Sequence, residues 1–198
     1  MATNKTEPQA HTAIHTSPQN IIKNLNKHAH WYALRCTPRH ERRIVERLAK
    51  CGIDSYVPVR RELHQWSDRK KWVDVVLTPR FIFVKIKLSE KSSVFVDRSI
   101  LSIVHMPGTG ATPCPIPDEQ MRAFIELTQR TSNLEVIQTP LTKGDFVRVM
   151  SGALEGYEGE FVHLDGQHKI IVRLNGALTV AVSMPKSMVE KVPRIRKK

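Results

Sequence analysis

The chain has 198 residues, of which 40% are hydrophobic and 25% are charged, as in soluble globular proteins with one or two small domains. No run approaches the roughly 18 to 20 apolar residues that span a bilayer, and residues 1–27 lack the apolar core of a secretion signal. We therefore expect a cytoplasmic protein that does not engage a membrane. Lysine and arginine number 31 against 19 acidic residues, and the formal charge of +12 favours a polyanionic partner.

The basic residues are concentrated in two places. Residues 30–71 hold eleven of them against five acids, and the last five residues, 194–198, hold four. This clustering indicates a binding surface in the early segment, although the same charges could simply solvate the surface. The three cysteines lack metal-ligand spacing, and no phosphate loop or nucleophile elbow is present, so we expect no metal, no cofactor and no enzymatic activity.

We expect residues 1–29 to form a disordered leader, because they contain too little apolar area to offset chain entropy. Order is predicted to begin with a strand over 31–36 and a helix that starts at Thr37-Pro38. Helical spacing places Ile44 and Leu48 on a buried stripe opposite an arginine-rich face. The arginines on that face are Arg39, Arg42, Arg43 and Arg47.

Further elements complete a first domain, which we place at residues 30–130. Strands are expected over 55–59, 72–77, 81–86 and 102–105, with a polar segment over 60–71, a short helix over 91–98 and a last helix starting at Asp118. These elements follow the β-α-β-β-α-β plan of a ferredoxin-like α+β domain with one extra helix.

The pattern of apolar and glycine residues changes after a linker predicted at residues 131–140. Over residues 141–193, short apolar alternations are separated by Asp165-Gly166 and Asn175-Gly176, dipeptides typical of hairpin turns. Five short strands in about fifty residues predict a small five-stranded β-barrel of the SH3-like or OB kind, and we favour the SH3-like form. A basic tail, residues 194–198, follows.

One strand poses a covering problem. In the strand over 81–86, side-chain alternation directs Phe81 and Phe83 to one face, while Ile82 and Val84 point to the other. Two helices of a ferredoxin-like domain cover only one face of the sheet. The aromatic face therefore needs another cover, which is either the extra helix around Phe124 or a partner protein.

Several segments of the chain resemble one known family. They are Trp31-Tyr32, the residues at 38–41, 65–72, 79–84 and 115–118, and the stretch over 144–159 with its three later glycines. Together they resemble the NusG family of transcription elongation factors across residues 31–193, most closely its specialised branch that includes UpxY and RfaH. Arg80 stands where the family usually has glycine, and Phe81 where it usually has tyrosine.

The resemblance implies an NGN domain followed by a KOW domain, in a monomeric transcription antitermination factor. Such a factor binds the clamp helices of bacterial RNA polymerase and suppresses pausing or termination on selected operons, for example those for polysaccharide biosynthesis. The residues implied in polymerase binding are Trp31, Tyr32, Leu77, Thr78, Pro79, Phe81 and Phe83.

The resemblance also implies that the basic segment reads non-template or upstream DNA, with Trp66 stacking on a base. The expected nucleic-acid contacts are Arg39, His40, Arg42, Arg43, Trp66, Arg69, Lys70 and Lys71. A solvated arginine face and a tryptophan packed on its own hairpin would explain the same residues.

The KOW domain is expected to dock Rho or a small-subunit ribosomal protein through Phe146, Leu154, Tyr157 and Phe161. Two rival functions stay open. One is a general NusG-type elongation factor linked to Rho or the ribosome, and the other is a ribosome-associated KOW protein that binds RNA.

Overall fold

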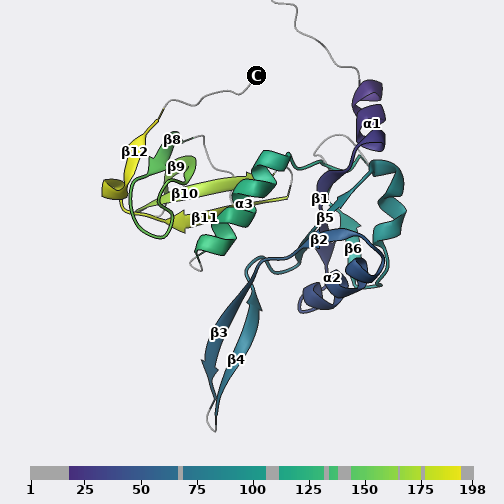
Figure 1. Cartoon of the computed structure of the whole chain (residues 1–198), viewed down its shortest axis with the longest axis horizontal. Helices are drawn as coiled ribbons and strands as arrows, with labels where there is room; N and C mark the ends of the chain where they lie inside the picture. Colours follow the sequence, from purple (N-terminus) through teal and green to yellow (C-terminus); the bar gives the residue numbers. More distant parts are fainter. Residues whose placement is uncertain are drawn as a thin grey trace, which may run out of the picture.

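The computed structural model of the chain describes residues 18–66, 69–105, 112–131, 134–137, 144–164, 166–174 and 177–192. These residues form two antiparallel sheets and a separate two-stranded hairpin, with helices around the first sheet (Figure 1). The predicted α+β class is confirmed.

The amino-terminal sheet consists of four strands. They are β1 (His30–Cys36), β2 (Asp54–Tyr56), β5 (Phe81–Ile86) and β6 (Ile100–Ile103). Their spatial order is β2-β5-β1-β6, and each neighbouring pair is antiparallel. The long β1 and β5 lie in the centre, because their apolar residues on both faces require cover on both sides.

Helix α2 (Glu41–Lys50) covers one face of this sheet. Its Ile44 and Leu48 are fully buried in one cluster with Tyr32 and Ile82, as the helical spacing predicts. The predicted helix start at Thr37-Pro38 is wrong. Arg39 has a φ of 67°, a left-handed conformation that an α-helix does not contain, so the chain turns before the helix begins.

Helix α3 (Asp118–Arg130) covers the opposite face of the sheet. Its Phe124 is fully buried, with its ring 5.1 Å from that of Phe83 and 6.1 Å from that of Tyr56, both edge-on. The Tyr56 hydroxyl also shares a hydrogen bond of 2.6 Å with Thr128 Oγ1. Of the two covers that the sequence leaves open, the extra helix is therefore the one that seals Phe83.

Two segments differ from the sequence prediction. The short helix expected over 91–98 is a 3-10 helix, η1 (Leu88–Val94). The leader expected to be disordered contains α1 (Pro18–Lys27), which packs against η1 and buries Leu25. This part of the leader orders because Leu25 finds apolar cover in the folded domain, and the remaining leader residues, 1–17, lie outside the described residues.

The polar segment predicted over 60–71 is not a loop. It forms a hairpin of β3 (Val59–Gln65) and β4 (Lys70–Val76), which projects away from both sheets (Figure 1). The register is regular from Val59 opposite Val76 to Gln65 opposite Lys70. Both faces of the ribbon are largely solvent-exposed, so its residues lack the apolar alternation that marks a half-buried strand.

The carboxy-terminal sheet contains six strands among the described residues. They are β7 (Glu135–Ile137), β8 (Asp145–Val149), β9 (Glu158–Leu164), β10 (Gln167–Leu174), β11 (Leu178–Ser183) and β12 (Val189–Lys191), with a 3-10 turn, η2 (Lys186–Met188), before the last. Their order is β12-β8-β9-β10-β11-β7. All five predicted strands are present. Gly152 and Gly156 have φ values of 88° and 77°, so these glycines make turns.

The sixth strand comes from the segment predicted to be a linker. Strand β7 pairs with β11, and the Glu135 carboxylate accepts a 2.6 Å bond from the ammonium of Lys169, whose side chain is 95% buried. The burial of a lysine requires such a partner. Residues 135–137 therefore belong to the carboxy-terminal sheet and are not part of a free linker.

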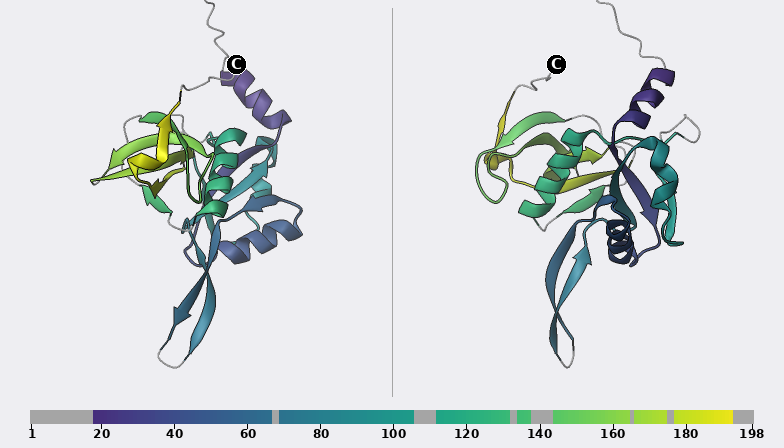
Figure 2. Two further views of the ribbon diagram at one scale, coloured as in Figure 1. Left: turned by 60° about the vertical axis from the view of Figure 1, so that its left-hand side comes forward. Right: turned by 45° about the vertical axis from the view of Figure 1, so that its right-hand side comes forward.

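Helix α3 lies between the two sheets (Figures 1 and 2). A single apolar cluster runs from Phe83 through Phe124 and Leu127 into the carboxy-terminal body, where it includes Leu154 and Tyr157 of the connection between β8 and β9. Hydrogen bonds also join α3 directly to the connection between β8 and β9. The Tyr157 hydroxyl donates to the Ala123 carbonyl at 3.3 Å, and the Arg130 guanidinium donates to the Glu155 carbonyl at 2.9 Å.

Replacement of Phe124 with alanine is expected to lower the free energy of unfolding by about 3 to 5 kcal/mol, because it leaves a cavity between Phe83 and Tyr56. Urea denaturation followed by circular dichroism measures this loss. Phe95→Ala is the matched control, since Phe95 is 49% exposed, and it should change stability by less than about 0.5 kcal/mol. Equal losses in the two variants would contradict this account of the core.

Candidate functional site

The aromatic face of the amino-terminal sheet is only partly accessible. Alternation along β1 and β5 directs Trp31 and Phe81 toward the side of α3, on which Phe83 also lies. Phe83 is fully buried beneath Phe124, whereas Trp31 and Phe81 are partly exposed. Helix α3 thus covers the centre of the aromatic face and leaves Trp31 and Phe81 partly accessible at either side of it.

Each remaining ring lies next to a cation. The Arg35 guanidinium carbon is 5.9 Å from the centre of the Phe81 ring, and the Lys85 ammonium is 5.9 Å from that of Trp31. These are cation–π distances, and they fix each ring beside a positive charge. Both positions therefore combine apolar area with a charge that suits an acidic partner surface.

Three of the residues predicted to bind the polymerase are not accessible. Tyr32, Thr78 and Phe83 are buried, with at most 1% of each residue exposed, so their side chains form no accessible surface here. Tyr32 points to the α2 side of the sheet, and burial raises the pKa of its hydroxyl to about 12. The accessible members of the set are Trp31, Leu77, Pro79 and Phe81.

The turn that presents Pro79 and Phe81 is fixed from α2. Arg80 has a φ of 73°, and its backbone N–H donates a 2.8 Å hydrogen bond to the Glu41 carboxylate, which is buried at the start of the helix. The Phe81 N–H closes the turn on the Thr78 carbonyl at 3.2 Å. Glu41 is a positioning residue that the sequence analysis missed. The signal in the sequence is Arg80, which stands where the resembled family usually has glycine, the residue that adopts a positive φ most readily.

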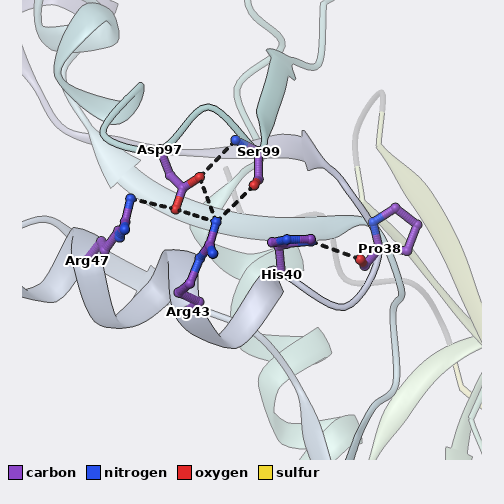
Figure 3. A network of polar contacts seen from close by, with 6 residues as sticks. All are labelled: Pro38, His40, Arg43, Arg47, Asp97 and Ser99. Carbon is purple, nitrogen blue, oxygen red and sulfur yellow. Dashed lines mark hydrogen bonds and ion pairs between the residues drawn. The ribbon is translucent and has the colours of Figure 1, made fainter.

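The arginines of α2 are largely engaged in ion pairs. The Arg43 and Arg47 guanidinium groups lie 3.2 and 2.9 Å from the buried carboxylate of Asp97, and the Ser99 N–H donates to the same carboxylate at 2.8 Å (Figure 3). The Ser99 N–H, together with the Ser99 hydroxyl and Arg43, lowers the pKa of Asp97 to about 2. Arg43 and Arg47 thus anchor α2 to the segment before β6, although each remains half exposed.

Of the other predicted contacts of this region, Arg39 and Arg42 are exposed and His40 is partly exposed. Arg42 forms a 3.0 Å ion pair with Asp74 of β4, and the side chain of Arg39 is exposed on the turn before α2. The His40 ring is within 3.1 Å of the Pro38 carbonyl (Figure 3). The ion pair of Arg42 connects α2 to the projecting hairpin, so the two basic segments form one continuous region.

The tip of the hairpin carries the remaining predicted nucleic-acid contacts. The Trp66 side chain is exposed, with 58% of the residue accessible. The backbone N–H of Trp66 donates a 2.8 Å hydrogen bond to the Arg69 carbonyl. Arg69, Lys70 and Lys71 are exposed on the strand that follows. Trp72 is not among the predicted contacts, because its residue pattern predicts a strand of the sheet, but it lies on the hairpin and is 56% exposed.

The predicted docking set of the carboxy-terminal sheet is divided. Leu154 and Tyr157 are buried against α3, so neither side chain is free to bind a partner in this arrangement. Burial also raises the pKa of the Tyr157 hydroxyl. Phe146 and Phe161 are partly exposed, and the Phe161 ring stacks on that of His168 with centres 5.1 Å apart.

Neither a metal centre nor a membrane span is found in the part of the chain that the structure describes. Histidine, cysteine, aspartate and glutamate side chains form no group of three or more among the described residues that could hold an ion. The helices among these residues are too short or too polar to cross a bilayer.

The sequence of this chain is similar to that of known transcription factors. Residues 29–125 match the NusG family model, described as "Transcription termination factor nusG". The "Transcription termination/antitermination protein NusG" of Streptococcus pyogenes serotype M1 is 22% identical over 163 residues, which cover 76% of this chain and 90% of the relative. The same values hold for the protein of serotype M18, strain MGAS8232.

Two comparisons with solved structures give low similarity. A chain from "Domain interaction in Thermotoga maritima NusG" has a TM-score of 0.47 and 21% identity, over 85% of this chain and 99% of that one. A chain from the MjSpt4:Spt5 complex in conformation A has a TM-score of 0.26 and 16% identity, over 82% of this chain and 97% of that one.

The depressed pKa of Asp97 predicts an acid-sensitive fold. The carboxylate has a lower pKa in the folded chain than in the unfolded chain, so its ionised form stabilises the fold above about pH 4. This contribution should disappear as the pH falls from about 4 to about 2. Chemical denaturation at pH 7 and pH 2 should show that Asp97→Asn destabilises the protein at pH 7 and makes much less difference at pH 2. A difference that is constant across this range would contradict the assignment.

The contact between α3 and the carboxy-terminal sheet should depend on Tyr157. Tyr157→Asp places a charge in the apolar cluster beside Ala123, which should separate the two bodies and increase the radius of gyration in small-angle X-ray scattering. Tyr157→Phe keeps the ring and loses one 3.3 Å hydrogen bond, so its radius should match that of the wild type. Circular dichroism checks that the sheet persists. An unchanged radius in Tyr157→Asp would show that the contact is held elsewhere.

Proposed function

We propose that this chain, whose residues 29–125 match the NusG family model, is a transcription antitermination factor of that family that binds the clamp helices of bacterial RNA polymerase. In this proposal the amino-terminal sheet with α2 and α3 is a ferredoxin-like NGN domain, and the carboxy-terminal sheet is a KOW barrel. The strand order β2-β5-β1-β6 supports the first assignment. The second is supported by the consecutive antiparallel strands β8 to β11, by the return of β12 to pair with β8, and by the glycine turns at Gly152 and Gly156.

The observation that carries the proposal is the accessible ring of Phe81 beside α3. Pro79 and Leu77 extend its apolar area, and Glu41 holds the turn in place through the Arg80 N–H. An aromatic side chain that becomes desolvated at the centre of an interface contributes about 2 kcal/mol or more to binding. A rigid, partly exposed ring of this kind suits a helical partner surface, because little conformational entropy remains to be lost.

The mechanism requires no covalent chemistry. A factor that binds the closed, elongating form of the polymerase more tightly than the paused form shifts the population toward elongation. The exposed cations of the hairpin and α2 contact the non-template or upstream DNA, and this contact restricts action to selected operons, for example those for polysaccharide biosynthesis.

The KOW domain recruits a second factor in this proposal. Because Leu154 and Tyr157 contact α3, the surface open to a partner in this arrangement is that of Phe146 and Phe161. Rho and a small-subunit ribosomal protein both remain candidates. A partner that needs Leu154 or Tyr157 must first displace the domain from α3.

Co-purification with bacterial RNA polymerase tests the proposal. Wild-type chain should retain the polymerase, whereas Phe81→Asp should lose most of it, because a carboxylate in the apolar contact costs desolvation energy. Phe95→Asp is the matched control. Phe95 is exposed at the end of η1, and this variant should retain the polymerase as the wild type does. Equal recovery of the two variants would reject Phe81 as the contact, and co-sedimentation with ribosomes without polymerase would favour the RNA-binding alternative.

A further inference from the structure

Two histidines lie directly opposite each other on the hairpin of β9 and β10. They are His163 on β9 and His168 on β10. The His168 carbonyl accepts a 2.8 Å hydrogen bond from the backbone N–H of Met184, which follows β11. Because the N–H and C=O groups of one residue in an antiparallel strand point to the same side, His168 bonds toward β11 and not toward β9. The two histidines are therefore a non-hydrogen-bonded pair, the kind in which opposed side chains approach most closely.

The separation of the two rings suits a shared metal ion. Their centres are 4.7 Å apart. An ion bound to an imidazole nitrogen lies about 2.1 Å from that nitrogen and about 3.2 Å from the ring centre. Two imidazoles at the angle of about 90 to 110° that a square-planar or tetrahedral ion imposes then have centres about 4.5 to 5.2 Å apart. The register thus already holds the two rings at the spacing of a chelate.

The nitrogens of the two rings are available to a ligand. Neither imidazole forms a hydrogen bond or an ion pair with another residue that the structure describes. His163 is exposed and His168 is partly exposed, so an ion in solution can reach both. His64 differs in this respect, because its ring lies 3.1 Å from the Glu62 carboxylate.

The neighbours of the pair also favour a bound ion. The Phe161 ring stacks on that of His168, with centres 5.1 Å apart and planes at 19°. This contact holds one ligand ring in place, so less conformational entropy is lost on binding. Lys169, adjacent in β10, points to the opposite face of the ribbon, where its ammonium pairs with Glu135. Its charge therefore offers little repulsion to a cation between the histidines.

We propose that His163 and His168 form a binding site for one divalent transition-metal ion, with Cu²⁺ preferred and Zn²⁺ or Ni²⁺ bound more weakly. Imidazole suits all three ions, and the affinity of a nitrogen site for divalent ions is highest at Cu²⁺. Two protein ligands are fewer than the four of a structural zinc site, so water completes the coordination and the ion exchanges readily. The site is consistent with the absence of any group of three ligand residues among the described residues.

This site corrects the expectation of no metal, which the sequence analysis based on the cysteines and on known motifs. The two histidines lie on either side of the turn at Asp165-Gly166 and meet only through the register of the hairpin. The inference does not rest on the proposed function, because it uses neither Phe81 nor the hairpin of β3 and β4. A bound ion would join β9 to β10 beside Phe161 and stabilise the folded hairpin, since it binds the folded form preferentially.

Isothermal titration calorimetry of the untagged, full-length protein with Cu²⁺, in a glycine buffer that keeps the ion soluble, tests the site. In every sample His11, His15 and His28 are replaced by glutamine, so that the histidines of the leader do not compete for the ion. The reference protein should bind one Cu²⁺ with a dissociation constant of about 100 µM or tighter. His163→Gln and His168→Gln should each weaken binding by about ten-fold or more, because only one imidazole remains.

The matched control is His64→Gln. His64 is also on a hairpin, but it lies opposite Lys71 and not opposite a second imidazole, so its replacement should change the affinity by less than about two-fold. Circular dichroism checks that each variant is folded. Electron paramagnetic resonance of the Cu²⁺ complex should show hyperfine splitting from two nitrogen nuclei in the reference protein and from one nitrogen nucleus in His168→Gln.

Three results would overturn the proposal. They are binding weaker than about 100 µM, a loss below ten-fold in either His163→Gln or His168→Gln, and a loss in His64→Gln as large as in those two variants. Splitting from a single nitrogen in the reference protein would also exclude a shared ion. None of these results bears on polymerase binding, which Phe81→Asp tests separately.

Discussion

The packing of α3 on the amino-terminal sheet determines most of what the rest of the molecule can do. Phe124 fills the space between Phe83 and Tyr56, so the centre of the aromatic face is sealed, and the rings of Trp31 and Phe81 stay partly exposed at its margins. The outer side of the same helix packs against Leu154 and Tyr157, which lie in the connection between β8 and β9. One helix therefore sets both the accessible area of Phe81 and the position of the second sheet.

The connection after α3 limits how far the second sheet can move. Strand β7 begins at Glu135 and is held to β11 by its ladder and by the buried ammonium of Lys169, so only residues 131–134 connect it to Arg130. Such a segment spans at most about 17 Å. While β7 stays paired, release of Tyr157 lets the carboxy-terminal sheet separate from α3 by no more than this span. A larger excursion requires β7 to leave the sheet, which would expose Lys169.

The elements that could be predicted from the sequence are those that depend on local requirements, namely the burial of an apolar run or the geometry of a tight turn. Apolar runs identified β5, and glycine dipeptides identified the hairpins of the second sheet, because burial and turn geometry are both local requirements. The start of α2 and the β3–β4 hairpin were not predictable in this way. The positive φ of Arg39 and of Arg80 depends on the surrounding fold, and both faces of the hairpin meet solvent, so neither leaves a periodic signal.

Residue type identified candidate contacts, but only the pairing of charges decides which of them remain available. Arg43 and Arg47 have the same chemistry as Arg61, yet their charges are balanced by Asp97, about fifty residues away in the chain, whose buried carboxylate no spacing rule connects to α2. Arg61 instead lies over an exposed indole ring. A net charge of +12 therefore overstates the charge that a polyanion meets at any one surface. Exposed cations beside an uncovered ring, as with Arg61 and Trp72 on the β3–β4 hairpin, are a more informative guide to such a surface than the net charge.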